Sequence, residues 1–366
     1  MRFKEFRKPL FEYDDLEKEK ENIISKISGM TASNPDEAAI LDRIWKILNT
    51  GTIGTNIDNA FNATISDEEF NQAELTKVKQ EIARLISNVE TDYKTLSNFV
   101  RRMETKGGVV DISKLKQPTA SFQEVFGDNS GIQAFNALAN YGVGKKQKGP
   151  GEYALACLSN QIKLADGEGD LEIKGIGKVE LKAAMSKSGG RIGYGGGSQK
   201  NKVDVLNQFK ERIPAVLQLL AKNAKGGSLG FGTFINGLNV DLPIQGGGSN
   251  PQAKGPENIQ NRIAITEALF SMDMDSYAKP VAQYIGNNED LAGCENQYLR
   301  ANFEWYKNRD HFDALLLMSI LKQKSMMITS GDDLIKARPN LDGLKISVIP
   351  TQAGAGREQW AQLTPK

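Results

Sequence analysis

The residues with the clearest capacity for chemistry lie between 150 and 185, where carboxylates and a lysine recur at short spacing. Asp170 is followed by Glu180, and Lys182 stands two residues further along. Because side chains alternate in an extended chain, Glu180 and Lys182 share one face of a strand while Leu181 points to the other. Carboxylates gathered at one site repel each other, and a divalent cation relieves that repulsion. The spacing therefore predicts a metal-binding site.

Hydrolysis of a phosphodiester is a reaction that such a site can perform. A divalent metal stabilises negative charge on the phosphoryl oxygens and lowers the pKa of a bound water. A neighbouring lysine can orient that water and stabilise the developing charge. Carboxylate oxygens select hard cations, so we expect Mg²⁺ or Mn²⁺ as the cofactor.

The order of these features resembles the core of the PD-(D/E)XK phosphodiesterase family. The matching parts are a helix carrying Glu152, the segment Gly-Asp-Leu-Glu-Ile at 169–173, the segment Val-Glu-Leu-Lys-Ala at 179–183 and Gly-Gly-Arg-Ile-Gly at 189–193. The resemblance runs from Gly151 to Lys200 and departs from the family's pattern at Gly169, where proline is the family's typical residue. It implies an α/β fold with a restriction-endonuclease-like mixed β-sheet flanked by helices.

The resemblance also implies a role for each of these residues. Asp170 and Glu180 are expected to ligate the metal with help from the Leu181 carbonyl, and Lys182 is expected to be the catalytic lysine. Glu152 matches an extra acidic residue found in some branches of the family, with a catalytic and metal-binding role. The residues expected to contact DNA are Lys145, Lys146, Lys148, Lys187, Arg191, Gln199 and Lys200. Together these roles predict a Mg²⁺-dependent deoxyribonuclease, which we expect to be an endonuclease.

Composition limits the other functions that the chain can have. The net charge of 366 residues is +1, so local basic clusters rather than the whole protein must attract DNA. The single histidine, His311, disfavours a conventional zinc site and histidine-based nucleases. The two cysteines suit a reducing cytoplasm, and no run approaches the roughly 20 apolar residues of a membrane helix. We expect a cytoplasmic protein of a bacterial host cell, or one carried in a phage virion, with no membrane partner.

Three regions are expected to position these residues. Apolar periodicity predicts a helical arm over 1–105, with helices over 14–27, from 38 to 48 and from 66 to 102. Residues 106–150 are expected to be a linker with short helices, and 151–366 an α/β nuclease domain. In that domain helices are predicted over 152–164, 201–223, 256–271 and 294–308, and strands over 170–173, 178–183, 312–318, 325–329 and 344–349.

Other interpretations of the sequence remain open. The opening Met-Arg-Phe-Lys-Glu-Phe is similar to short leaders of internal head proteins of large tailed bacteriophages, which favours a virion or DNA-associated structural protein with an inactive nuclease-like domain. The helical arm equally suits homo-oligomerisation. Glu180 and Lys182 are alternatively ordinary surface residues of a hairpin, and Asp273 and Asp275 are expected to be solvated loop acids. Metal dependence separates the nuclease from these alternatives.

Overall fold

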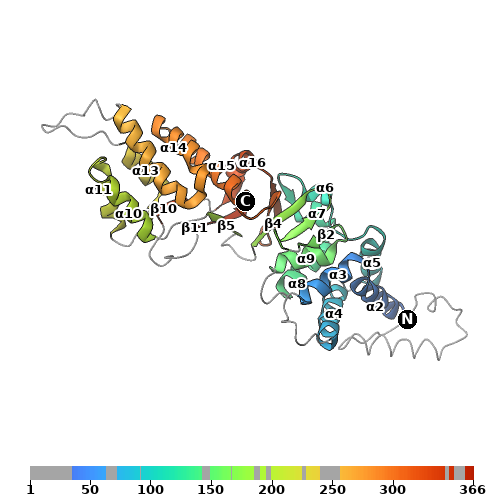
Figure 1. Ribbon diagram of the computed structural model, residues 1–366. Coiled ribbons are helices and arrows are strands. Elements are labelled where there is room, and N and C mark those ends of the chain that lie inside the picture. Colours follow the sequence, from blue (N-terminus) through green and yellow to red (C-terminus); the bar gives the residue numbers. More distant parts are fainter. Residues whose placement is uncertain are drawn as a thin grey trace, which may run out of the picture. The chain divides into compact units, whose positions relative to one another are not determined.

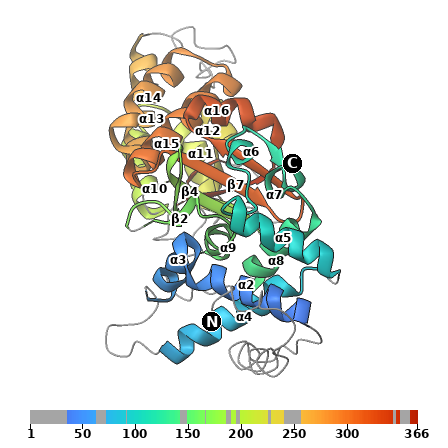
Figure 2. The ribbon, with the colours of Figure 1, turned by 90° about the vertical axis from the view of Figure 1, so that its right-hand side faces the viewer.

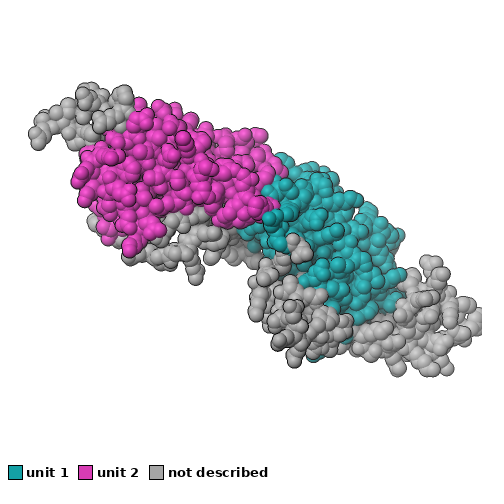
Figure 3. Space-filling model, in the orientation of Figure 1, with its two compact units in different colours: residues 1–185, 312–327 teal, residues 186–311, 328–366 magenta. Residues whose placement is uncertain are grey.

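The chain folds into two compact units in the computed structural model, and Figure 3 shows them in different colours. Unit 1 comprises residues 1–185 and 312–327, and unit 2 comprises residues 186–311 and 328–366. The structure describes residues 35–62, 72–90, 92–141, 149–165, 167–184, 190–194, 199–224, 228–239, 256–342, 346–349 and 359–366. This division differs from the expected one, because the N-terminal helices share a unit with Asp170 and Glu180, while the expected domain 151–366 is split between the units.

Unit 1 is a mixed α/β structure, as expected. Its helices are α2 (Pro35–Asn49), α3 (Gly51–Asn62), α4 (Gln72–Ser87), α5 (Tyr93–Thr105), α6 (Ile112–Leu115), α7 (Phe122–Phe126), α8 (Asn129–Tyr141) and α9 (Pro150–Leu158). Its strands are β1 (Ala120–Ser121), β2 (Ile162–Leu164), β3 (Leu171–Ile173), β4 (Gly177–Ala184), β7 (Ala314–Ser319) and β8 (Lys324–Ile328). The predicted helix over 152–164 is too long, since α9 ends at Leu158 and β2 follows it.

The strands of unit 1 form one six-stranded mixed sheet in the order β1-β8-β7-β4-β3-β2. Strands β2, β3 and β4 follow one another as an antiparallel meander. Strand β4 then pairs in parallel with β7, with Val179 opposite Ala314. Parallel neighbours need a long connection, and here the chain forms the first part of unit 2 before it returns at Phe312.

The apolar stripes of the N-terminal helices are buried within unit 1 and do not stand out as an arm. Leu41 and Ile44 of α2 and Ile57 of α3 belong to the same hydrophobic core as Leu171 and Val179 of the sheet. Figures 1 and 2 show α9 beside β2 and β4, and α3 contacts both α9 and β2. The helices thus cover one face of the sheet and bury it.

The single long helix predicted over 66–102 is wrong, because the structure has two helices there. α4 ends at Ser87 and α5 begins at Tyr93. Asp92 caps α5 by accepting a hydrogen bond from the Thr95 amide, which is a typical start of a new helix. The helix predicted over 14–27 lies outside the described residues.

A buried asparagine joins the helices of unit 1 to the edge of the sheet. Asn56 Nδ2 donates hydrogen bonds to the carbonyls of Ala156 at 3.1 Å and Ile162 at 2.8 Å. Asn56 Oδ1 accepts a hydrogen bond of 3.4 Å from the Leu164 amide. The side chain therefore covers part of the outer edge of β2, where unpaired backbone groups would otherwise invite another strand.

Unit 2 contains mainly helices and two small sheets. Its helices are α10 (Gln199–Phe209), α11 (Ala215–Asn223), α12 (Phe231–Leu238), α13 (Pro256–Met274), η3 (Asp275–Tyr277), α14 (Ala278–Asn287), α15 (Leu291–Arg309), α16 (Gly331–Ala337) and η4 (Arg338–Asn340). Strands β6 (Leu229–Gly230) and β10 (Ser347–Ile349) pair with each other, while β11 (Gln359–Pro365) lies between β5 (Gly190–Tyr194) and β9 (Leu341–Asp342). None of the helices described in either unit is long and apolar enough to cross a membrane.

The helix predicted over 201–223 is interrupted in unit 2. α10 ends at Phe209 and α11 starts after Pro214, since proline lacks the amide hydrogen and clashes with a preceding helical turn. The predicted helices over 256–271 and 294–308 correspond to α13 and α15. α14, between them, was not predicted.

Candidate functional site

All four predicted catalytic residues lie in unit 1, near strand β4. Asp170 immediately precedes β3, while Glu180 and Lys182 belong to β4. The antiparallel register pairs Leu171 with Val179, and Asp170 stands one residue before that pair. The Asp170 amide donates to the Val179 carbonyl at 3.0 Å, which extends the ladder to this point.

Two hydrogen bonds define the geometry of this site. Asp170 Oδ2 accepts a hydrogen bond of 2.8 Å from the Leu181 amide. Lys182 Nζ donates a hydrogen bond of 2.5 Å to Glu180 Oε1. Since the N–H and C=O of one residue point to the same side of an extended strand, the Leu181 carbonyl faces the same edge of β4 as Asp170. The arrangement gathers carboxylate and carbonyl oxygens at that edge.

Helix α9 contributes Glu152 to the same region. Gly151 lies so close to β4 that an added Cβ would approach the Ala183 Cβ to 2.5 Å, so glycine allows the helix to contact the strand. Glu152 follows directly and is only 7% exposed. An added Cβ on Gly149 would likewise lie 2.6 Å from Glu152 Oε1. Gly149 therefore leaves room for the buried Glu152 carboxylate, and Gly151 lets α9 lie against β4.

The three carboxylates act together on the lysine. Burial lowers the pKa of the Lys182 ammonium, but attraction to Glu180, Asp170 and Glu152 outweighs burial and leaves that pKa above its ordinary value. Three carboxylates against one ammonium give the cluster a formal charge of about −2 when all are ionised. The cluster thus has an excess of negative charge in a partly buried place.

The donor types at this site fit a hard divalent cation. Carboxylates and a backbone carbonyl are the oxygen donors that Mg²⁺ and Mn²⁺ prefer. Among the residues that the structure describes, no group of three or more Asp, Glu, His or Cys side chains is arranged to hold a metal ion. Glu180 instead contacts Lys182, so the cluster has suitable donors arranged around an ammonium group.

The sequence did not predict how firmly β4 is joined to β7. Asp313 Oδ2 accepts a hydrogen bond of 2.9 Å from the Lys178 amide, and the Asp313 amide donates to the Lys178 carbonyl at 2.7 Å. Gly177 has a φ of +107°, and a Cβ there would lie 2.1 Å from Asp313 Oδ2. Two features of the sequence could have indicated this contact: the glycine at 177, and the aspartate directly before the apolar run 314–318. Asp313 positions the strand that carries Glu180.

The predicted DNA-contacting residues are less closely defined by the structure. Lys145, Lys146, Lys148 and Lys187 lie outside the described residues. Arg191 lies in β5 and Gln199 begins α10, where the structure describes their backbone, and Lys200 is exposed in α10. These last three residues belong to unit 2. All seven remain predicted DNA contacts.

A second charged cluster occurs in unit 2, and it corrects the expectation for Asp273. Asp273 is not a solvated loop acid, because it lies in α13 with 0% of its surface exposed. Its Oδ1 accepts a hydrogen bond of 2.5 Å from Nζ of Lys202, which is also fully buried. Lys202 donates in addition to the Val348 carbonyl at 2.9 Å, and the Tyr298 hydroxyl donates to Asp273 Oδ2 at 3.4 Å. Charge is balanced within this cluster.

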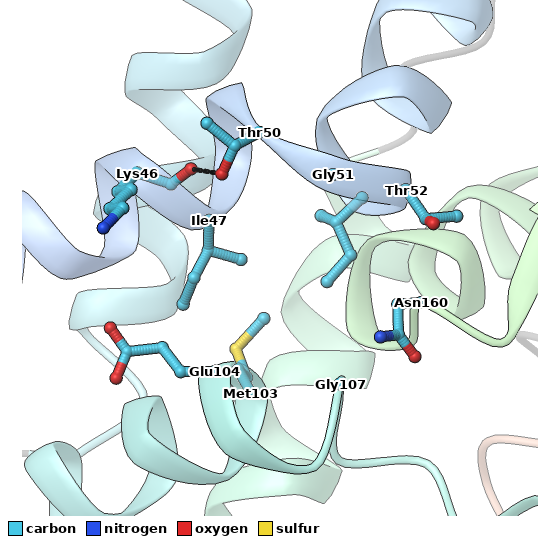
Figure 4. Close-up of a pocket in the computed structure, with 10 residues that line it drawn as sticks. Lys46, Ile47, Thr50, Gly51, Thr52, Met103, Glu104, Gly107 and Asn160 are labelled. Carbon is cyan, nitrogen blue, oxygen red and sulfur yellow. Dashed lines mark hydrogen bonds between the residues drawn. The ribbon is translucent and has the colours of Figure 1, made fainter.

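A cleft of about 440 Å³ in unit 1 is separate from the acidic site. Figure 4 shows its lining, in which Lys46 lies in the last turn of α2, Thr50 follows that helix, Thr52 lies in the first turn of α3 and Asn160 lies two residues after α9. Its one carboxylate, Glu104, is bound by the Arg43 guanidinium at 2.6 Å. The residues that line this cleft do not include a paired acid and base, so it is not our candidate catalytic site.

The chain also contains one match to the serine-hydrolase pattern Gly-x-Ser-x-Gly, at residues 226–230. That pattern places the serine on a turn between a strand and a helix. Here the two-residue strand β6 follows Ser228, and α12 follows β6 directly. The order of elements therefore does not support a nucleophilic Ser228.

Comparison with protein families, with curated proteins and with solved structures finds no match for this chain.

Proposed function

We propose that unit 1 is a metal-dependent nuclease that hydrolyses DNA phosphodiester bonds as an endonuclease. The observation that supports this most is the hydrogen bond from the Leu181 amide to Asp170 Oδ2, which holds Asp170 beside the part of β4 that carries Glu180 and Lys182. The mixed sheet with helices packed against it agrees with the restriction-endonuclease-like fold that we propose for unit 1.

Asp170, Glu180 and Glu152, together with the Leu181 carbonyl, would hold the metal. When bound, Mg²⁺ or Mn²⁺ supplies Lewis-acid stabilisation of phosphoryl charge and lowers the pKa of water. The hydrogen bond from the Leu181 amide fixes Asp170 beside the strand edge. Lys182 keeps a positive charge at neutral pH, because the surrounding carboxylates raise its pKa. That charge is placed to stabilise negative charge that develops on a phosphate.

DNA is the proposed partner, and six basic residues and one glutamine outside the acidic site would bind its backbone. We propose Lys145, Lys146, Lys148, Lys187, Arg191, Gln199 and Lys200 for this role. Contacts to phosphates release counterions, so affinity for DNA should fall steeply as salt rises. A binding titration between about 50 and 200 mM salt measures this slope.

Cleavage of DNA tests the proposal directly. Purified protein is incubated with supercoiled plasmid and with linear duplex, in Mg²⁺, Mn²⁺ or EDTA. The wild type should nick or degrade DNA only with metal, and the Lys182→Ala variant should not. Lys178→Ala is the matched control, because this lysine lies on the same strand but pairs with the exposed Glu168.

The outcomes separate the alternative functions. Metal-dependent cleavage of both substrates supports an endonuclease, provided that circular dichroism shows Lys182→Ala to be folded. Absence of cleavage of plasmid, duplex, single-stranded and branched DNA in either metal would contradict the proposal. That result would favour a virion or DNA-associated structural protein with an inactive site.

A further inference from the structure

An asparagine in the interior of unit 2 carries polar atoms that its protein surroundings do not satisfy. Asn302 lies in α15 and is 0% exposed. Within the described part of the chain, its side-chain Nδ2 and Oδ1 have no hydrogen-bond partner. Buried polar groups are almost always hydrogen-bonded, because burying them unpaired costs free energy. The Asn302 side chain therefore needs a partner that is small enough to be buried with it.

Asn302 differs in this respect from other asparagines on the helices of this protein. Asn49 of α2, Asn140 of α8 and Asn287 of α14 each donate from Nδ2 to the carbonyl four residues earlier, at 2.7, 2.9 and 2.8 Å. The equivalent acceptor for Asn302 is the Tyr298 carbonyl, to which its Nδ2 does not donate. The Asn302 amide is thus not satisfied by its own helix, and its partner must lie between the helices.

Two hydrogen bonds between elements place Asn302 across from the end of α13. Tyr298, one turn before Asn302, donates from its hydroxyl to Asp273 Oδ2 at 3.4 Å. Trp305, three residues after Asn302, donates from Nε1 to Asp275 Oδ2 at 3.0 Å. Residues three and four positions apart share one face of a helix. Asn302 therefore lies between these two contacts and faces the segment that carries both aspartates.

Asp273 has an oxygen that can accept a further hydrogen bond in this region. Its Oδ1 accepts a short bond of 2.5 Å from Lys202, whereas the bond from Tyr298 to Oδ2 is long at 3.4 Å. Hydrogen bonds from hydroxyl groups are typically about 2.7–2.8 Å long. A carboxylate oxygen can accept more than one hydrogen bond, so Oδ2 has capacity for a donor at closer range.

We propose that unit 2 binds one internal water molecule that bridges Asn302 and Asp273. The water accepts a hydrogen bond from Asn302 Nδ2 and donates its hydrogens to Asn302 Oδ1 and Asp273 Oδ2, and internal waters commonly make about three such bonds. The neighbouring side chains of Phe270, Leu299 and Phe303 are at most 1% exposed, so a larger ligand has no route to this place. The bridge joins α15 to α13 and helps to solvate the buried carboxylate.

Nuclear magnetic resonance of the isotope-labelled, full-length protein tests the bridge. The Asn302 Nδ2 hydrogens should show NOE and ROE cross-peaks of opposite sign at the water frequency, as expected for a water that tumbles with the protein. The spectrum of Asn302→Leu assigns these hydrogens. Asn140 is the matched control, because its exposed amide contacts only mobile solvent and should lack this pair of cross-peaks. Tyr298→Phe removes a nearby hydroxyl that exchanges with water, and the Asn302 cross-peaks should persist in it.

Thermal denaturation of Asn302→Leu gives a second readout, whose sign separates the two possible states of the amide. If the water is bound, this substitution removes its hydrogen bonds and weakens the solvation of Asp273. The melting temperature should then fall by at least about 2 °C. If the amide has no partner, leucine replaces an unsatisfied buried group of similar volume, and the melting temperature should rise.

The Lys202→Met/Asp273→Leu variant tests the other end of the bridge, because it keeps Asn302 and removes the carboxylate. The water cross-peaks of Asn302 should be lost in this variant. Their persistence in the folded variant would overturn the bridge, since the water would then not depend on Asp273.

The wild-type spectrum decides the proposal even where a variant does not fold. Absence of the Asn302 cross-peaks from the wild type would overturn the proposal. So would their loss in Tyr298→Phe, which would assign them to the hydroxyl, or a higher melting temperature of Asn302→Leu. The bridge lies in unit 2 and does not depend on the proposed nuclease site of unit 1.

Discussion

The two units of this protein treat buried charge in opposite ways. In unit 2, Lys202 and Asp273 form an ion pair with both side chains fully buried. Lys202 also donates a hydrogen bond to the Val348 carbonyl, and Asp273 accepts one from the Tyr298 hydroxyl. In unit 1, three carboxylates surround Lys182, and the Lys182–Glu180 pair keeps some exposure to solvent. The cluster of unit 2 has equal positive and negative charge and is fully buried, while the cluster of unit 1 has an excess of negative charge and is partly exposed to solvent.

This difference separates a structural pair from a candidate active site. A fully buried pair contributes to one packed arrangement and leaves no charge for a ligand to neutralise. An unbalanced cluster at the end of a strand has negative charge that a cation can neutralise. The excess of carboxylates in unit 1 therefore points to ligand chemistry, whereas burial alone does not.

The largest expected effect is loss of nuclease activity when a carboxylate of unit 1 is neutralised. Asp170→Asn and Glu180→Gln each keep the side-chain shape but remove a proposed metal ligand, so cleavage should fall by about 10³-fold or more. Initial rates of plasmid nicking in Mg²⁺ measure the loss. Glu172→Gln is the matched control, since Glu172 lies exposed on β3. Cleavage that is equally reduced by Glu172→Gln would place the chemistry elsewhere.

Breaking the pair of unit 2 should cost stability. Lys202→Met or Asp273→Leu alone leaves one buried charge without its partner, and the free energy of unfolding should fall by about 3–5 kcal/mol. The double variant removes both charges and should lie within about 1 kcal/mol of the wild type or above it. Denaturant unfolding followed by circular dichroism measures all three. A double variant as unstable as the sum of the single variants would show that Lys202 and Asp273 are not coupled, and it would contradict this account.

The pH dependence of the free energy of unfolding gives a further test of the buried pair in unit 2. Burial raises the pKa of the Asp273 carboxyl to about 6, although Lys202 and Tyr298 oppose that rise. A folded-state pKa above the ordinary value of 3.8 means that this group contributes stability at low pH and loses it as the pH rises through about 6. Between about pH 4 and 6 the wild type should lose unfolding free energy relative to the Lys202→Met/Asp273→Leu variant. If the free energy of unfolding changes with pH in the same way for both proteins, the raised pKa of Asp273 is contradicted.

The smallest expected effect concerns Asn56, which joins the helices of unit 1 to the edge strand. Asn56→Ala leaves the buried carbonyls of Ala156 and Ile162 without these donors, so the free energy of unfolding should fall by about 1–3 kcal/mol. Asn140→Ala is a matched control, because its amide makes one exposed bond within α8; the expected change is about 0.5 kcal/mol or less. Equal changes in both variants would show that the edge contact adds no stability.

Local sequence patterns predicted the hairpin that carries the site. Alternation of apolar and charged residues over 170–173 and 178–183 identified β3 and β4, and it placed Glu180 and Lys182 on one face. The order of Asp170 and Glu180 along the chain was sufficient to bring them together, because a short turn fixes an antiparallel register. The site was accessible to prediction because its parts are close in sequence.

Contacts between segments that are distant in sequence could not be predicted from such local patterns. The parallel partner of β4 begins at Ala314, after the chain has formed most of unit 2. Lys202 and Asp273 lie 71 positions apart, and charged residues are exposed by default, so their burial had no local signal. Asn56 looks like any polar residue of an amphipathic helix. Contacts between distant segments decide these features, and short periodicities do not report them.

One assay compares the two clusters most directly: Mg²⁺-dependent nicking of supercoiled plasmid by the wild type, by Lys182→Ala and by the Lys202→Met/Asp273→Leu variant. Our account predicts that Lys182→Ala loses activity, while the unit 2 variant keeps about the wild-type rate because its pair is structural. An active Lys182→Ala protein, or a folded unit 2 variant that has lost cleavage, would contradict the assignment of the chemistry to unit 1.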